Sequence, residues 1–276
     1  MRAALLQLSS SDDPHSNLRV TSDLVHSAAS DGAELILTPE VTNCVSNSRT
    51  HQQGVLQAEA DDITLAGLRE DAKTLGVWIL IGSLALKSEP PEERFANRSF
   101  LIAPDGGIAA RYDKLHMFDV QVTETETFKE SAGFAPGNRA VVADTPFAKI
   151  GMTVCYDVRF AYLYRALAKA GAQIMTVPAA FSPATGPMHW ESLLRARAIE
   201  TGSFVLAPAQ MGQHDVSRGR NRSTHGHSLA VSPWGEVLCD AGQKFGVHLV
   251  DLDMSLVAEA RQKIPSLQHD RDFSGP

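Results

Sequence analysis

The stretch KIGMTVCYDVRF, residues 149–160, decides most of what the sequence implies about the fold. The apolar run over residues 150–154 predicts a strand, and the charged residues after Cys155 predict a turn that opens a helix. A strand-to-helix elbow exposes one side chain at the lip of a sheet, where free backbone N–H groups stabilise an oxyanion or a thiolate. Cys155 is therefore a candidate nucleophile, although a lone cysteine at the end of a strand is more often a small buried hydrophobe.

Short apolar runs alternate with amphipathic stretches on both sides of this elbow. Strands are predicted at residues 2–8, 34–38, 77–84, 99–103, 108–112, 140–143, 173–177, 204–207 and 247–252, and helices at 17–29, 63–75, 161–170, 189–201 and 255–263. Hairpin signals mixed with helical crossovers predict mixed sheets. The fold class is therefore predicted to be α/β, a four-layer α-β-β-α sandwich of two mixed sheets.

Composition limits the possible partners and the location. The 276 residues contain no linker, repeat or charge block, which predicts one domain over residues 1–276. A net charge of −7 argues against nucleic-acid binding, and the densest basic stretch, residues 218–222, is predicted to be a solvated loop. The first apolar run is too short for a signal peptide or a membrane span, and three widely spaced cysteines fit a reducing compartment. A cytoplasmic protein without membrane attachment is expected.

Three segments end a predicted strand with an ionisable or nucleophilic side chain. They are LILTPE with Glu40, ARYDKLHMF with Lys114 and GMTVCYD with Cys155. Taken singly, Glu40 and Lys114 would be assigned to a helix cap or to the solvated surface. Together, at the same ends of neighbouring strands, a thiol, a carboxylate base and an ammonium that favours the anionic forms predict amide hydrolysis.

Four short blocks, in this order, resemble the nitrilase superfamily of carbon–nitrogen hydrolases over essentially the whole chain. They are TPE, YDKLHMFD, FKESAGFAPG and VCYDVRF, and TGPMHWESLLRARAIE and GHSLAVSPWGEV follow them. The resemblance implies that Cys155 is the nucleophile, Glu40 the general base and acid, and Lys114 the ammonium beside the oxyanion. It further implies that Glu130 supports the site and that the backbone N–H of Tyr156 is the second oxyanion donor. The reaction would pass through a thioester without a metal or an organic cofactor.

Further positions concern the substrate, which is expected to be a small amide bearing a carboxylate. Arg159 is predicted to bind that carboxylate, with a helix-terminal ion pair to Asp157 as the alternative. The resemblance implies that Phe181 and Thr185 line the pocket. The run LLRARAIETGSFVLAPAQMGQH resembles the deaminated-glutathione amidase branch, which implies hydrolysis of deaminated glutathione to 2-oxoglutarate and cysteinylglycine. An ω-amidase acting on 2-oxoglutaramate or succinamate is the alternative, and a nitrilase comes third.

Two hypotheses from other classes remain open. His214, His225 and His227 suggest a metal site, but the spacing lacks a further ligand in register. The other hypothesis is a binding module without catalysis. The resemblance also implies a homodimer or a larger homo-oligomer, with the charged and apolar residues of the helix at 189–201 as a candidate interface.

Overall fold

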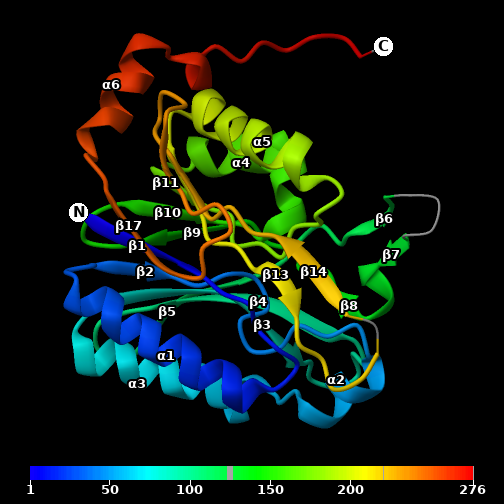
Figure 1. Cartoon of the computed structure of the whole chain (residues 1–276). Helices are drawn as coiled ribbons and strands as arrows, with labels where there is room; N and C mark the ends of the chain where they lie inside the picture. The colour runs from blue at the N-terminus through cyan, green and yellow to red at the C-terminus, as the bar shows by residue number, and fades with distance from the viewer. Residues whose placement is uncertain (123–126, 220, 276) are drawn as a thin grey trace.

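The computed structural model describes residues 1–122, 127–219 and 221–275. Two mixed β-sheets stack face to face, and helices cover the outer face of each sheet (Figure 1). The predicted four-layer α-β-β-α sandwich is confirmed.

Each sheet has three parallel strands at its centre, and most of the strands toward its edges pair antiparallel. The order of the first sheet is β17 (Gly246–Asp251), β1 (Arg2–Gln7), β2 (Leu35–Leu37), β3 (Trp78–Lys87), β4 (Phe95–Ile102) and β5 (Ile108–Asp113), and β8 (Phe134–Ala135) pairs with β4. The order of the second sheet is β16 (Val237–Asp240), β15 (Leu229–Val231), β12 (Phe204–Ala207), β11 (Ile174–Thr176), β10 (Lys149–Met152) and β9 (Val141–Asp144).

The helices lie outside the two sheets, and two small hairpins extend from one end (Figure 1). Helices α1 (Pro14–Ser30) and α3 (Ile63–Leu75) cover the first sheet, and α4 (Ala161–Lys169) and α5 (Gly186–Thr201) cover the second. The chain also forms α2 (Arg49–Val55), α6 (Ser255–Lys263), the hairpin of β6 (Asp119–Gln121) with β7 (Thr127–Lys129), and the hairpin of β13 (Met211–His214) with β14 (Arg222–His225). The sequence did not predict α2 or these hairpins, because they are short and mostly polar.

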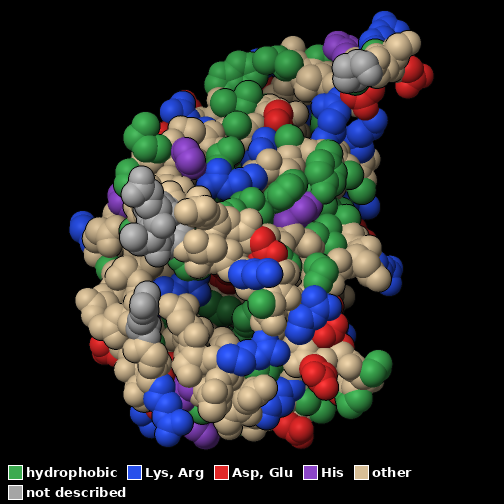
Figure 2. All heavy atoms as spheres, turned by 90° about the vertical axis from the view of Figure 1, so that its right-hand side faces the viewer, with side chains coloured by type: hydrophobic (Ala, Val, Ile, Leu, Met, Phe, Trp, Pro, Cys, Tyr) green, Lys and Arg blue, Asp and Glu red, His purple; other side chains and the backbone are tan. Residues whose placement is uncertain are grey.

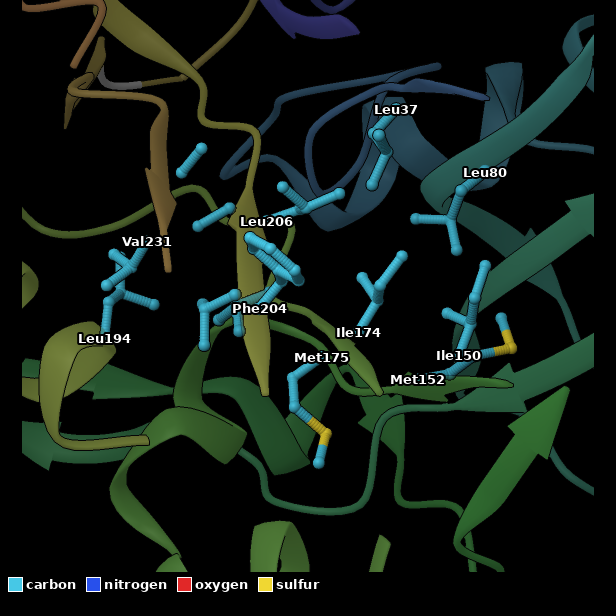
Figure 3. Close-up of a cluster of buried hydrophobic side chains, with 14 of the residues drawn as sticks. Leu37, Leu80, Ile150, Met152, Ile174, Met175, Leu194, Phe204, Leu206 and Val231 are labelled. Carbon is cyan, nitrogen blue, oxygen red and sulfur yellow. The ribbon is translucent and has the colours of Figure 1, made fainter. Parts of the chain in front are cut away.

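The strands are apolar on both faces because each sheet packs against helices on one side and against the other sheet on the opposite side. Along β1, Leu5 faces the second sheet, whereas Leu6 packs with the residues beneath α1 and α3. Between the sheets, Leu37 and Leu80 point toward Ile150 and its neighbours on β10 and β11 (Figure 3). Continuous apolar runs, rather than alternating ones, are the expected sequence pattern for such strands.

Gly82, in the irregular stretch of β3, permits a close approach between segments of the two halves of the fold. A Cβ atom there would lie 2.0 Å from the Thr38 carbonyl oxygen and 2.5 Å from both the Pro39 oxygen and the Pro178 Cβ. Pro39 precedes Glu40, and the Pro178 oxygen accepts a hydrogen bond from the Cys155 N–H. Gly82 therefore sets how closely the segments that carry these two residues pack.

We expect Gly82→Ala to lower the free energy of unfolding by about 3 kcal/mol, because backbone must move to admit the methyl group. Gly54 in α2 is the matched control, since a Cβ there meets nothing within 4 Å. Gly54→Ala should instead raise stability by about 0.5–1 kcal/mol. Urea unfolding of both variants tests the contrast, and equal midpoints would show that β3 shifts without cost.

Candidate active site

A cavity of about 1110 Å³ lies at the end of the sandwich that carries the two hairpins. Figure 2 shows this face hollowed, with Lys and Arg side chains around the opening. Seven of the eight predicted site residues line the cavity: Glu40, Lys114, Glu130, Cys155, Tyr156, Phe181 and Thr185. Arg159 does not belong to the lining.

The two sheets contribute different groups to the site. Glu40 follows β2 of the first sheet, and Lys114 follows β5 directly. Cys155 comes after β10 of the second sheet. The second sheet also positions the carboxylate from the first, since the Ala180 N–H, beyond the end of β11, donates to Glu40 Oε2 at 2.8 Å.

Cys155 occupies a strained turn. Its φ angle is +48°, in the left-handed region that non-glycine residues seldom adopt, and a 3₁₀-helix over Cys155–Arg159 begins at this residue. Val41, directly after Glu40, has a φ of +49°, and its N–H donates to Ser83 Oγ at 2.8 Å. Strained backbone beside both reactive groups is typical of positions where geometry serves function.

A buried ammonium joins the two carboxylates. Lys114 Nζ donates to Glu40 Oε1 at 2.9 Å and to both oxygens of Glu130, each at 2.9 Å. The Lys114 side chain is only 2% exposed, so water does not screen these contacts. Glu130 Oε2 also accepts the Phe118 N–H at 2.7 Å, which ties Glu130 to the start of β6.

The buried charges shift the pKa values of Glu40 and Lys114, and these shifts favour the charged form of both groups. Burial by itself would raise the pKa of Glu40, but the charge and hydrogen bond of Lys114 outweigh it, and the pKa of Glu40 is lowered. Burial likewise disfavours the Lys114 ammonium, but Glu130 and Glu40 raise its pKa well above the usual value. The resting site therefore contains a carboxylate and an ammonium.

The Lys114 ammonium favours the anionic form of the Cys155 thiol, as the sequence predicts, but other effects outweigh it. Burial raises the pKa of the Cys155 thiol well above its usual value, and the Glu40 and Glu130 charges act in the same direction. Lys114 alone opposes them. The direction of this shift keeps the proton on the thiol, and the Glu40 carboxylate is close enough to contribute to it.

Tyr156 and its neighbours complete the elbow. Tyr156 is the second residue of the 3₁₀-helix, where backbone N–H groups lack partners within the helix. Asp157 is fully buried and accepts hydrogen bonds from Tyr112 Oη at 2.6 Å and from the Val154 N–H at 2.8 Å. It therefore anchors the elbow to the strand that precedes Lys114. The alternative of an Arg159 ion pair with Asp157 is wrong.

Arg159 lies beside the cavity rather than in its wall. Its guanidinium carbon is 5.6 Å from the ring centroid of Phe181 and 5.8 Å from that of Tyr156, and Nη2 is 3.2 Å from His189 Nδ1. Both aromatic residues line the cavity. Binding of a substrate carboxylate by Arg159 stays a prediction.

The cavity also contains cationic residues that were not predicted from the sequence. Arg222, which the sequence predicted to lie in a solvated loop, lines the cavity and donates from Nη2 to the Ala180 oxygen at 3.1 Å. Arg220, in the same stretch, lies outside the described residues. Arg49 also lines the cavity, with its guanidinium carbon 4.7 Å from the Phe95 ring centroid. No local pattern marked either arginine, because only tertiary packing brings α2 and β14 to the cavity.

The three histidines considered as metal ligands have other contacts. His214 is buried between the Ser10 carbonyl oxygen and Thr224 Oγ1, each 2.8 Å from a ring nitrogen. The rings of His225 and His227 stack on each other at 4.6 Å. Within residues 1–122, 127–219 and 221–275, no three His, Cys, Asp or Glu side chains are arranged to hold a metal ion.

The fold matches the class that the sequence resembles, the nitrilase superfamily. The family model described as carbon-nitrogen hydrolase matches residues 2–262, and the chain belongs to this family. It is similar to the deaminated glutathione amidase of Yersinia enterocolitica, with 39% identity over 98% of this chain and 93% of the relative.

Two solved structures are similar over nearly the whole chain. Nit3 of Saccharomyces cerevisiae, described as a member of branch 10 of the nitrilase superfamily, has a TM-score of 0.86 and 26% identity, covering 99% of this chain and 97% of Nit3. An amidase of Nesterenkonia sp. AN1, in which acrylamide has added to the active-site cysteine, has a TM-score of 0.77 and 28% identity, covering 96% and 98% of the two chains. Among the described residues, no helix has the length and apolar character needed to cross a membrane.

Proposed function

We propose that the protein cleaves a linear amide through a Cys155 thioester, with Glu40 as the base. The observation that carries this proposal is the buried contact of Glu40 with both the Lys114 ammonium and the Cys155 thiol, inside a large cavity. As Cys155 Sγ attacks the amide carbon, the thiol proton passes to Glu40. Lys114 and the Tyr156 N–H stabilise the resulting oxyanion. Glu40 then protonates the leaving nitrogen as the carbon–nitrogen bond breaks.

The second half of the reaction restores the enzyme. Glu40 takes a proton from a water molecule, which attacks the thioester carbon. The carbon–sulfur bond breaks, the thiol is reprotonated by Glu40, and a carboxylic acid leaves. Glu130 keeps Lys114 in place throughout, because both of its oxygens accept hydrogen bonds from Nζ.

We further propose deaminated glutathione as the substrate, with 2-oxoglutarate and cysteinylglycine as products. The Yersinia relative carries that activity in its name. The lining residues with full charges are Arg49, Lys114, Lys129 and Arg222 against Glu40 and Glu130, a surplus of two positive charges in a chain of net charge −7. Such a cavity attracts an anion, and deaminated glutathione has a carboxylate at each end.

Two further features suit a long polar substrate. The cavity volume of about 1110 Å³ is slightly larger than the roughly 300–1,000 Å³ that small-molecule sites occupy. Thr185 lines this cavity, and its Oγ1 is buried without a hydrogen-bond partner among the described residues. A substrate oxygen or N–H would supply that partner.

Product analysis distinguishes this substrate from that of an ω-amidase. Purified protein is given deaminated glutathione or, separately, 2-oxoglutaramate, and the products are identified by mass spectrometry with Cys155→Ala as control. Cysteinylglycine released much faster than ammonia is the expected result. Faster ammonia release would identify an ω-amidase instead, and no turnover of either would overturn both substrate assignments.

Arg159→Ala should lower kcat/KM about tenfold or more, because a charge-assisted contact to the substrate carboxylate is lost. The rate of Cys155 alkylation should stay the same, since Arg159 does not contact the thiol. Arg195→Ala is the matched control, because Arg195 on α5 instead bonds the Gly235 oxygen and Glu191. Unchanged kinetics in Arg159→Ala would remove Arg159 from substrate binding.

We also propose a homodimer formed through the outer face of the second sheet's helices. Large apolar side chains are exposed there: Tyr162 on α4, Met188 and Ile199 on α5, and the nearby Trp234, each more than half exposed. Exposed apolar residues gathered in one region mark interaction surfaces. Sedimentation at micromolar concentration should show twice the 29.8 kDa chain mass, and Met188→Asp should shift the distribution to monomer. A single species at 29.8 kDa would contradict the proposal.

A further inference from the structure

Asn97 on β4 contacts both carboxylates of the site, although no motif in the sequence drew attention to it. Its Nδ2 lies 2.9 Å from Glu40 Oε1 and 3.3 Å from Glu130 Oε1. The side chain is buried, with 2% of its surface exposed, and it lines the cavity. Its Oδ1 is also buried and has no hydrogen-bond partner among the described residues.

Asn43, a nearby buried asparagine, shows the contacts that are expected when an asparagine side chain stabilises the fold. Asn43 is fully buried, and its Oδ1 accepts the Ala85 N–H at 2.9 Å while its Nδ2 donates to the Ala85 oxygen at 2.9 Å. Ala85 is the residue paired with Asn97 across the β3–β4 ladder. Asn43 therefore uses both ends of its amide on the Ala85 backbone, with one further contact of 3.3 Å from Nδ2 to Asp62 Oδ2. Asn97 uses only its donor end, and both of its contacts go to the carboxylates of the site.

The unpartnered Oδ1 of Asn97 is costly for stability, since a buried acceptor loses its hydrogen bond to water. A side chain selected only for packing would avoid that penalty. A buried unsatisfied group in a native protein calls for an explanation, and a role in function is one of them. The contacts of the donor end therefore point to the function of Asn97.

A side-chain amide suits this position because it is uncharged and has two N–H donors. Glu40 and Glu130 share a single ammonium, Lys114, and two carboxylates close together favour protonation of one of them. The Asn97 amide gives each carboxylate a further donor without adding a charge. Hydrogen bonds to an ionised carboxylate favour the ionised form, and Glu40 must be ionised to accept the thiol proton.

We propose that Asn97 is a positioning residue that acts through Glu40, keeping this carboxylate ionised and directed toward the Cys155 thiol. The inference rests on the proposed role of Glu40 as general base. Asn97 forms no bond to the substrate in this role. Its effect is on the pH range in which Glu40 works and on the orientation of the carboxylate.

The test compares the pH dependence of kcat/KM in wild type, Asn97→Leu and Asn97→Asp. The pKa of Glu40 is lowered in the wild type, so the acid limb of its profile should fall below the ordinary value for a glutamate. Asn97→Leu removes the donor and should move the acid limb upward by about one pH unit. Asn97→Asp keeps the side-chain size but adds a third carboxylate, and it should move the limb at least as far and lower kcat/KM at pH 7 about tenfold or more.

Asn43→Asp is the matched control, because it changes the same atoms in a side chain that bonds the backbone. It should lower the melting temperature and leave the acid limb in place. If both Asn97 variants lose stability but keep the wild-type acid limb, Asn97 is structural and the proposal is overturned. If Asn97→Leu does not fold, the isosteric Asn97→Asp carries the test alone.

The same experiment separates this inference from the proposed function. A wild-type protein without amide turnover, or a Cys155→Ala variant that keeps it, would overturn the thioester mechanism itself. The other outcome concerns Asn97 alone. If the wild type is active and Cys155→Ala is inactive, but the acid limb does not move in the Asn97 variants, only the proposed role of Asn97 is overturned.

Discussion

Cys155→Ala should abolish amide hydrolysis, with kcat reduced about 10⁴-fold or more, because the thiol that forms the proposed thioester is lost. Cys44 also lines the cavity, but burial raises the pKa of its thiol to about 12. The fold should persist, since the methyl group of alanine occupies part of the space of the buried thiol and the backbone contact of Cys155 N–H with the Pro178 oxygen is unchanged. Steady-state kinetics and a thermal melt measure the two effects. Mass spectrometry of the wild type quenched during turnover should show one added acyl group, and the variant should show none.

Cys239→Ala is the control for the loss of a thiol as such. Cys239 lies on β16 at the edge of the second sheet and is only half-buried. Its replacement should leave kcat and KM unchanged. If Cys155→Ala retained turnover while both variants folded, the nucleophile would have to be sought elsewhere and a non-covalent mechanism considered.

Glu40→Gln should lower kcat about 10³-fold, within the range that a positioned general base contributes. Glutamine has the same size and can still accept from the Ala180 N–H, so the site should keep its shape. It cannot take the proton of Cys155, whose pKa is raised well above the usual thiol value. The thiol would stay protonated and attack the amide slowly.

The comparison variant is Glu34→Gln, which neutralises a carboxylate on the same segment but outside the cavity. Glu34 Oε1 accepts the Arg2 N–H at the surface, so this change should have little effect on turnover. Thermal melts of both variants exclude unfolding as the cause of any loss. A Glu40→Gln enzyme with nearly full kcat at pH 7 would show that another group, or solvent, accepts the thiol proton.

The overall architecture was predictable because it follows from local periodicity. The strands β3 and β12 are apolar on both faces. Both faces are buried at once only when other layers of the fold pack against the two sides of the sheet. The elbow after Val154 was predictable for the same reason, since an apolar run stops where charged residues begin. Helix starts were less accurate: α1 begins at Pro14 rather than at residue 17, because the Asp13 carboxylate caps the first turn.

The site was predicted in part. Glu40, Lys114 and Cys155 each follow a strand, and this position distinguishes them in the sequence from other ionisable or nucleophilic residues. Arg222 and Asn97 have no such distinction, because one lies in a short polar hairpin and the other in the middle of a strand. Neither position is unusual in the sequence, and each becomes part of the site only through contacts with residues far along the chain.

The sequence alone determined the order of elements and the class of fold, and it identified three candidate reactive groups, because hydrophobic periodicity and chemical type belong to each segment by itself. The tertiary structure decided which groups meet and which of them is charged. Glu40 comes from the first sheet and Cys155 from the second, so their contact depends on how the sheets pack around Gly82. The proton rests on the thiol because burial and two carboxylates act on Cys155 together, and both effects exist only after the chain has folded.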